Sequence, residues 1–201
     1  MADNDRNDER TDEELAREAR AGSRRSFEEL ACRYKRRLFV YLRPRLGSDE
    51  DAEDIVQETF LKLYRNIAGY DPAFKFSTWL YTSANRLSID AYRKGAARRE
   101  MTVADGDVDI PDPAAGAASA SGESNLWDSA RALGGDRFRV LWLRYGEDLS
   151  VEEIAAVLGR TRLAIRVLLH RARTSLAGRL GQDPRCVVRP QAGAAPDAAR
   201  D

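Results

Sequence analysis

The chain has 201 residues, with 33 basic and 33 acidic side chains and 43 % hydrophobic residues, enough for one medium domain or two small ones. The net charge is zero, but the basic and acidic residues are distributed unevenly along the chain. Residues 24–99 carry 16 basic and 10 acidic side chains and residues 131–185 carry 11 and 6, whereas residues 100–130 carry seven acidic and no basic ones. Basic blocks attract nucleic-acid phosphate, although Arg-rich helices are equally common as plain soluble surfaces.

The remaining composition excludes several classes of protein. Two cysteines, Cys32 and Cys186, lie in unlike contexts, which argues against a disulfide framework and for a reducing compartment. No apolar run reaches the 18 residues that a membrane span needs, and the polar N-terminus does not have the form of a signal peptide. We therefore expect a cytoplasmic protein.

The first predicted helix follows an acidic segment, residues 1–10, that we expect to be disordered. Thr11 and Glu14 have the spacing of a capping box, in which each side chain satisfies a backbone N–H of the other residue. The pattern predicts a short helix to about Arg20.

Three longer helices are indicated next by apolar residues at helical spacing. One starts near Ser26 and is ended or kinked by Pro44. Another begins after Ser48, which can cap it. The fourth runs from about Ser77 and ends at Arg93-Lys94-Gly95, with Trp79 and Phe76 more typical of core residues than of exposed ones.

A change of composition then divides the chain. Residues 97–125 are rich in Ala, Gly, Ser, Pro and Asp and predict a flexible acidic linker, and residues 181–201 predict a disordered tail. No strand pattern stands out. We predict an all-α protein of two small helical domains, residues 11–96 and 126–180.

The second domain carries the pattern of a helix-turn-helix. Ser150 and Glu153 form a second capping box, Gly159 has the place of a left-handed C-cap, and Thr161 can cap the next helix. Small Ala155 fits a close helix crossing, and Ile165 would pack back against it. This order predicts a DNA-binding helix-turn-helix rather than an ordinary helical hairpin.

The second helix of that motif, about residues 161–178, would enter the major groove. Its predicted outward residues are Thr161, Arg162, Leu163, Arg166, Val167 and His170. Arginines can reach guanine edges or phosphates, and apolar side chains can meet thymine methyl groups. Arg171 and Arg173 are either phosphate anchors or a solvated basic end. His170 is the only histidine and has no partner for a metal, so we predict no metal site and no cofactor.

Two segments resemble a known family. Residues 52–94, AEDIVQETFLKLYRNIAGYDPAFKFSTWLYTSANRLSIDAYRK, resemble domain 2 of the sigma-70 family in its small extracytoplasmic-function (ECF) branch. Residues 137–176, which include the helix-turn-helix, resemble domain 4 of the same branch. The resemblance implies a dissociable initiation subunit of bacterial RNA polymerase and not an enzyme. Domain 2 would dock on the clamp helices and open the −10 element, and domain 4 would read the −35 element beside the flap.

The resemblance also assigns residues to these roles. On the third helix the expected polymerase-binding residues are Asp54, Gln57, Glu58 and Leu61, whose alternative is a solvated face with one core leucine. The residues expected at the −10 element are Phe74, Lys75, Trp79, Tyr81, Asn85, Arg86, Arg93 and Lys94. Aromatic stacking can hold unstacked bases at about 1–3 kcal/mol per base.

Two departures from the family pattern concern promoter choice. The usual Arg-Asn order on the fourth helix is reversed to Asn85-Arg86, which turns the asparagine by about 100° around the helix. In the recognition helix, a serine and an arginine of the family pattern become Val167 and Leu168. Leu168 is expected in the core, and Val167 makes the DNA-facing surface drier.

Alternatives remain open at this point. One is a helix-turn-helix regulator that acts without core polymerase, although residues 11–95 show no dimerisation element or effector pocket. Another is a helical adaptor, or a sigma-like protein that binds polymerase without initiating. An anti-sigma protein is a further potential partner, which the linker would permit.

Overall fold

A computed structural model describes residues 10–46, 48–100 and 122–182; the side chains of 94–100, 122–125 and 181–182 lie outside that description. The described residues form helices and no strand, so the all-α prediction is confirmed. The first group of helices consists of α1 (Asp12–Arg20), α2 (Arg24–Leu46), α3 (Asp49–Arg65), a 3-10 turn (Ile67–Gly69) and α4 (Phe76–Glu100). The second consists of α5 (Gly122–Arg131), α6 (Gly135–Leu141), a π-helical turn (Trp142–Gly146), α7 (Val151–Leu158) and α8 (Arg162–Gln182).

The helix starts follow the predicted capping signals. Thr11 Oγ1 accepts a hydrogen bond from the N–H of Glu14, whose carboxylate accepts the N–H of Thr11 in return, at 3.2 and 2.8 Å. Ser48 caps α3 by accepting from the N–H of Asp51. Both contacts satisfy backbone donors that the first turn of a helix leaves free.

Two helices extend beyond their predicted ends. Pro44, expected to end or kink α2, does not end it: the helix runs to Leu46, because a proline in the last turn disturbs only the final part of the hydrogen-bond ladder. Helix α4 continues past Gly95 to Glu100, within the segment assigned to the linker. A single glycine costs a helix about 1 kcal/mol, and the two alanines after it are the best helix formers.

The predicted terminal and linker segments fall mostly outside the described residues, namely 1–9, 101–121 and 183–201. Arg10, assigned to the disordered N-terminus, is described and pairs with Glu18 and Glu29. Helix α5 begins at Gly122, and α8 reaches Gln182, each slightly beyond the predicted domain boundaries.

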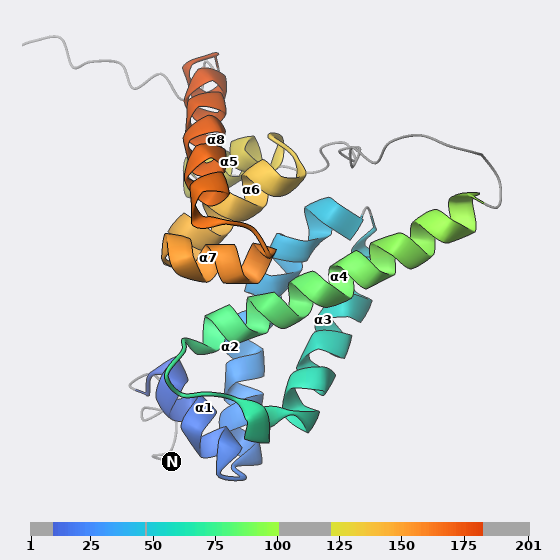
Figure 1. The fold of residues 1–201 in the computed structure, drawn as a ribbon, viewed down its shortest axis with the longest axis vertical. Helices are drawn as coiled ribbons and strands as arrows, with labels where there is room; N and C mark the ends of the chain where they lie inside the picture. Colours follow the sequence, from blue (N-terminus) through green and yellow to red (C-terminus); the bar gives the residue numbers. More distant parts are fainter. Residues whose placement is uncertain (1–9, 47, 101–121, 183–201) are drawn as a thin grey trace, which may run out of the picture.

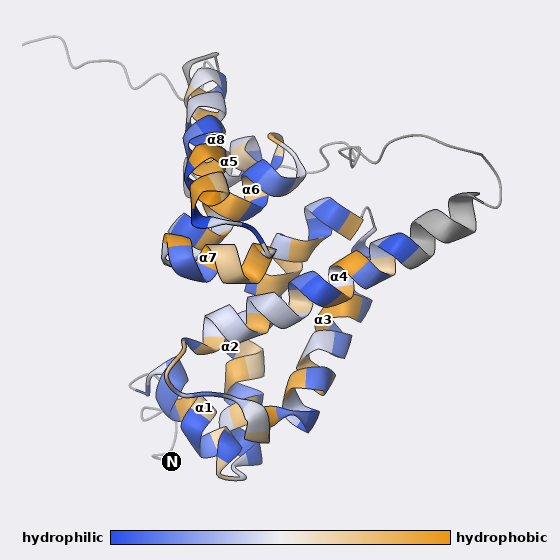
Figure 2. Ribbon diagram, in the orientation of Figure 1, coloured by the Kyte–Doolittle hydropathy of each residue, from blue (hydrophilic) through white to orange (hydrophobic). Residues whose placement is uncertain are grey.

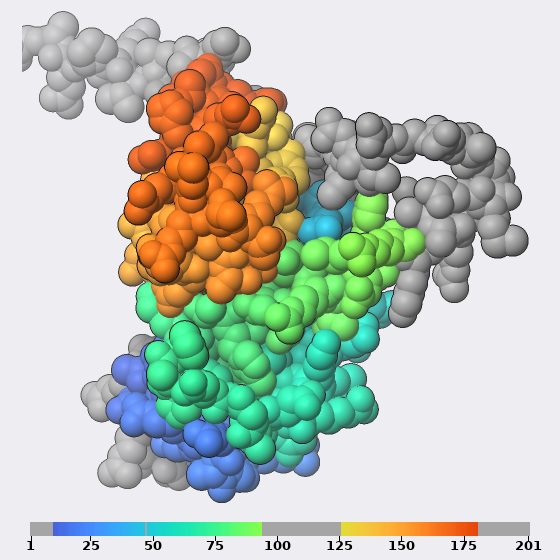
Figure 3. Space-filling view, viewed as in Figure 1, coloured from blue at the N-terminus to red at the C-terminus, as the bar shows by residue number. Residues whose placement is uncertain are grey.

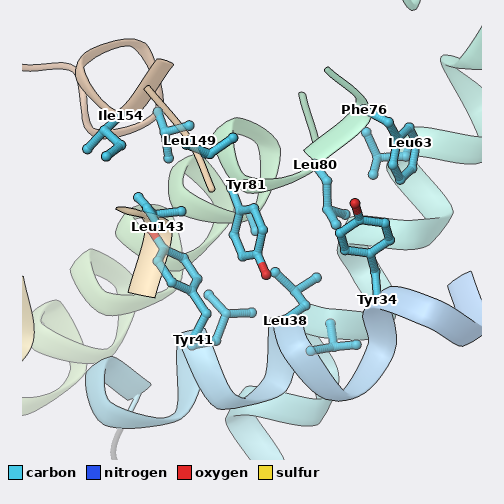
Figure 4. Close-up of a cluster of buried hydrophobic side chains, with 14 of the residues drawn as sticks. Tyr34, Leu38, Tyr41, Leu63, Phe76, Leu80, Tyr81, Leu143, Leu149 and Ile154 are labelled. Atoms are coloured by element: carbon cyan, nitrogen blue, oxygen red, sulfur yellow. The ribbon is translucent and has the colours of Figure 1, made fainter. Parts of the chain in front are cut away.

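The two groups of helices pack directly against each other. Helix α7 lies on α4, and α6 meets α2 (Figures 1 and 3). One cluster of buried hydrophobic residues includes members of both groups. Figure 4 shows Tyr41 and Tyr81 of the first group beside Leu143, Leu149 and Ile154 of the second. Hydrophilic and hydrophobic residues alternate along the helices, as expected where each helix has one buried side (Figure 2).

Candidate nucleic-acid interface

The turn between α7 and α8 has the geometry that the sequence predicts. Ser150 and Glu153 form the capping box at the start of α7, with contacts of 3.2 and 2.7 Å. Gly159 adopts φ 64° and ψ 35°, the left-handed region that favours glycine, and its N–H donates to the carbonyl of Ala155. Thr161 Oγ1 then accepts from the N–H of Ala164, which caps α8.

The packing of the turn leaves one face of α8 open. Ile165 and Leu169 are buried against the inner side of α7, and Leu168 packs at the edge of the core, as predicted. Every residue predicted to face DNA is exposed: Thr161, Arg162, Leu163, Arg166, Val167, His170, Arg171 and Arg173. Leu163 is 71 % exposed and Val167 is 43 % exposed, surrounded by arginines.

Helix α3 presents a second open face. Asp54, Gln57, Glu58 and Leu61 are all exposed, while the opposite side of the helix is buried against α2 and α4. Leu61 is 55 % exposed and is not part of the core, so the alternative of a core leucine is wrong. The face therefore combines carboxylates with an unpaired apolar side chain, which suits a basic, amphipathic partner helix.

The residues predicted at the −10 element divide into an exposed and a buried set. Phe74, Lys75, Arg86 and Arg93 are exposed, and the side chain of Lys94 lies outside the described residues. Trp79 is half-buried and packs its ring against Tyr70 and Phe76, while Phe76 is fully buried as predicted. Tyr81 and Asn85 are 0 % and 4 % exposed.

Tyr81 is buried between the two groups of helices: its ring packs against Tyr41 of α2, and its hydroxyl meets the second group. Its hydroxyl donates to Glu147 Oε1 at 2.6 Å and accepts from Trp142 Nε1 at 3.3 Å. Arg37 of α2 also reaches Glu147: Nε donates to Oε1 at 3.1 Å, and Nη2 lies 2.7 Å from Oε2. Burial raises the pKa of the Glu147 carboxyl, and it raises the pKa of Tyr81 well above its usual value.

Asn85 is held by the same group of helices. Its Nδ2 donates to the carbonyl of Val157 at 2.8 Å, and its Oδ1 accepts from Arg139. Arg139 also donates from Nε and Nη2 to the hydroxyl of Tyr41, at 3.2 and 3.1 Å. These contacts place a predicted DNA-reading side chain inside the interface between the two groups.

Sequence reasoning missed the three residues that organise this interface, Arg37, Arg139 and Glu147. Each is separated from its partners by tens of residues, so no local spacing could reveal it. The one available signal is the segment Tyr145-Gly146-Glu147-Asp148, where polar residues interrupt an apolar pattern. There the π-helical turn ends and Asp148 adopts a positive φ of 48°, which carries Glu147 towards α4.

The described residues carry neither a metal-binding cluster nor a membrane-spanning helix. Within residues 10–46, 48–100 and 122–182, no group of three or more His, Cys, Asp or Glu is placed to hold a metal ion. None of the helices in those ranges combines the length and apolar character needed to cross a bilayer.

Comparison with known proteins agrees with the arrangement of the helices. Residues 30–99 match the family described as Sigma-70 region 2, and residues 126–176 match Sigma-70, region 4. The ECF RNA polymerase sigma factor BldN of Streptomyces coelicolor is 31 % identical over 176 residues, which cover 86 % of this chain and 67 % of BldN. The corresponding SigW of Bacillus subtilis is 29 % identical over 180 residues, covering 82 % of this chain and 94 % of SigW.

A solved structure supports the same assignment. The sigma factor CnrH, in complex with the cytosolic domain of CnrY, is 26 % identical with a TM-score of 0.58, covering 86 % of this chain and 98 % of CnrH. The two matched regions occur in the same order as the two groups of helices. The chain belongs to the sigma-70 family, in its ECF branch.

Proposed function

We propose that this protein is a dissociable initiation subunit of bacterial RNA polymerase that reads the −35 and −10 promoter elements and promotes DNA opening. The observation that carries the proposal is the exposed basic and apolar face of α8, mounted on a capped turn at Gly159. Membership in the ECF branch supports the rest, and it gives no support to a regulator that acts without core polymerase.

The first contact in this proposal is between α3 and the clamp helices of the polymerase. The exposed carboxylates of Asp54 and Glu58 flank Leu61, so a partner helix with basic residues around an apolar stripe would match both features. A few residues that are desolvated near the centre of such a contact usually carry most of the binding free energy, and Leu61 is placed to be one of them.

The second contact is between α8 and the −35 element beside the polymerase flap. Arg162 and Arg166 are placed to reach guanine edges or phosphates. Leu163 and Val167 are one helical turn apart on the same exposed face, so both can meet thymine methyl groups in the major groove. Arg171 and Arg173 lie further along the helix as phosphate contacts.

The third contact is at the −10 element, where α4 and the loop before it hold separated bases. Phe74 offers an exposed aromatic ring, and Lys75, Arg86 and Arg93 supply positive charge. Because Arg86 is exposed where the family pattern has asparagine, we expect a basic contact at that position. Tyr81 and Asn85 would join this surface once it is uncovered.

The chemistry of transcription belongs to the polymerase in this proposal, and the chain itself is not an enzyme and uses no cofactor. It positions the core enzyme and separates DNA strands in the cytoplasm, where the polymerase works. An anti-sigma protein is a further expected partner, since CnrH is solved with the cytosolic domain of CnrY.

The test is a pull-down with bacterial core polymerase followed by run-off transcription from a genomic promoter library. The full chain should be retained by core and start transcription at defined sites. The Leu61→Ala, Glu58→Lys double variant should bind core at least about tenfold more weakly, because it removes the apolar anchor and reverses a charge. Glu28→Lys, an exposed charge reversal on α2, is the matched control and should bind core normally. A chain that binds promoter DNA alone and never associates with core would contradict the proposal.

A further inference from the structure

The outward face of α8 has an apolar centre. At 100° per residue, Leu163, Val167 and His170 lie within about 60° of one another around the helix. All three are exposed and lie on the side opposite Ile165 and Ala172, which are buried. The middle of the exposed face is therefore formed by two apolar side chains and one imidazole.

Arginines lie on both flanks of this face. With the same helical geometry, Arg166 and Arg171 lie about 60° and 80° to either side of Leu163, and Arg173 lies close to Arg166. All three arginines are exposed, and the sequence of α8 contains no acidic residue. Such a face fits a groove whose two walls are anionic and whose floor offers apolar groups.

Arg162 lies at the margin of the face rather than at its centre. It is about 100° around the helix from Leu163, and its Nη1 lies 3.5 Å from Glu152 Oε1 of α7. Its guanidinium is thus shared with a carboxylate of the neighbouring helix. The residues that face straight outwards from the first two turns remain Leu163 and Val167.

The major groove of DNA has the matching chemistry. Phosphates line both of its edges, and the C5 methyl group of thymine is the apolar group that the base edges present there. When a helix enters the groove with its flanking arginines at the phosphates, the middle of its outward face meets the base edges. Leu163 and Val167 cannot donate or accept a hydrogen bond through their side chains, so a methyl group is the base feature they can recognise.

Both side chains also have apolar surface left to bury. Leu163 is 71 % exposed and Val167 is 43 % exposed. Removal of apolar surface from water favours binding, and it corresponds to about a fourfold gain in affinity for each methyl or methylene group that is buried. A contact with thymine methyl groups is therefore large enough to select a sequence.

We propose that Leu163 and Val167 set the choice of −35 sequence by contact with the methyl groups of two thymines, while the flanking arginines supply affinity through the phosphates. Side chains one helical turn apart are about 5–6 Å apart, and successive base pairs are about 3.4 Å apart. The two thymines are therefore one or two base pairs apart, on either strand. This inference rests on the proposed role of α8 at the −35 element and names the base feature that it reads.

The first test uses the holoenzyme formed from the full chain and bacterial core polymerase. The probe is a promoter library in which the base pairs around −35 are randomised. Thymine should be enriched at two positions that are one or two base pairs apart. Deoxyuridine, which lacks only the methyl group of thymine, should then weaken binding about fourfold at each of these positions. Deoxyuridine at any other thymine of the selected element should leave binding unchanged.

The second test assigns each methyl group to a side chain. Leu163→Ala should bind the thymine and deoxyuridine forms equally at one of the two positions, and Val167→Ala should do so at the other. Arg171→Ala should weaken both forms to the same extent, because a phosphate contact is blind to the base. Leu126→Ala, which truncates a leucine that is 41 % exposed on α5, is the matched control and should change neither affinity nor discrimination.

The outcomes separate this inference from the proposed function. Equal binding of the thymine and deoxyuridine forms by the unmodified chain would overturn the inference, as would discrimination that survives in both alanine variants. Weaker retention of Leu163→Ala or Val167→Ala by core, with discrimination intact, would show that the apolar pair contacts a protein and would also overturn it. If core never retains the unmodified chain, the proposed function fails. The same selection on the free chain then supports the methyl contact if deoxyuridine weakens binding and overturns it if binding is unchanged.

Discussion

Helices α4 and α8 both carry residues expected to read promoter DNA, but they differ in what covers them. The outward face of α8 is exposed along its first three turns, with Leu163 and Val167 unpaired. On α4, Arg86 and Arg93 are exposed while Tyr81 and Asn85 are buried under α7 and the preceding loop. The predicted −35 surface is therefore exposed in this arrangement, whereas part of the predicted −10 surface is covered.

The two helices differ in exposure because different kinds of contact hold them in place. Helix α8 is fixed by a local turn, in which Ser150, Gly159 and Thr161 each satisfy a neighbouring backbone group. Helix α4 instead exchanges hydrogen bonds with partners distant in sequence. A locally mounted surface keeps its geometry in any arrangement of the two groups, and a surface built from long-range contacts changes when they separate.

Among the contacts that bury α4, the largest loss of stability is expected for Arg139→Ala. The variant removes a buried guanidinium that donates to Tyr41 and Asn85 and pairs with Asp136. We expect the free energy of unfolding to fall by about 2–4 kcal/mol, because buried acceptors lose their donors. Urea unfolding followed by circular dichroism measures the change.

Arg137→Ala is the control for that prediction, since Arg137 is exposed two residues away on α6. Its free energy of unfolding should change by no more than about 0.5 kcal/mol. Equally small losses for both variants would mean that the polar contacts do not hold the two groups together, and the contrast between α4 and α8 would disappear.

A smaller change in the free energy of unfolding is expected at the turn between α7 and α8. Gly159→Ala places a Cβ at a positive φ and should lower the free energy of unfolding by about 1–2 kcal/mol, although the space around the Cβ is open. Gly178→Ala, at an exposed helical position with similar space, should raise it by about 0.5–1 kcal/mol. Changes of the same sign in both variants would show that backbone conformation at Gly159 does not define the turn.

The smallest effect concerns the titration of Glu153. Burial acts to raise the pKa of this carboxyl, but hydrogen bonds from Ser150, with Lys75 and Thr78 across the interface, outweigh it and lower the pKa. A lowered pKa means that the ionised carboxylate stabilises the fold above its unfolded pKa, and that this contribution is lost as the pH falls. Thr78→Ala should therefore raise the pKa of Glu153, as measured by NMR titration.

Glu14 provides the internal control for that titration. Its pKa is lowered chiefly by the hydrogen bond with the backbone of Thr11, within a capping box that does not involve the second group of helices. The pKa of Glu14 should stay unchanged in the Thr78→Ala variant. No shift at Glu153 would show that the Thr78 contact is not part of the interface in solution, and a shift at Glu14 would show that the substitution perturbs the fold more widely.

Local signals in the sequence predicted much of this structure. The capping boxes at Thr11 and Ser150, the cap at Ser48 and the left-handed Gly159 each depend on residues within a few positions, and all are confirmed. The extension of α4 past Gly95 was not predicted, because Arg93-Lys94-Gly95 resembles a helix end, whereas the alanines that follow favour a helix.

The covered state of α4 could not be predicted in the same way. Tyr81 and Asn85 lie on the side of α4 that meets the second group, and contacts with Glu147 and Val157 contribute to their burial. That burial depends on tertiary contacts between residues more than 50 positions apart, to which helical periodicity is blind. The exposure of the α8 residues predicted to face DNA could be predicted because it depends on the local turn.

The most direct test of the account is the distance between the two groups of helices before and after polymerase binding. Spin labels at Glu28→Cys on α2 and Ala177→Cys on α8, both exposed positions, report this distance when Cys32 and Cys186 are changed to serine. Pulsed electron paramagnetic resonance should give one narrow distance for the free chain and a different distance when core polymerase is added. An unchanged distance on polymerase binding, or a broad spread of distances already present in the free chain, would contradict the account.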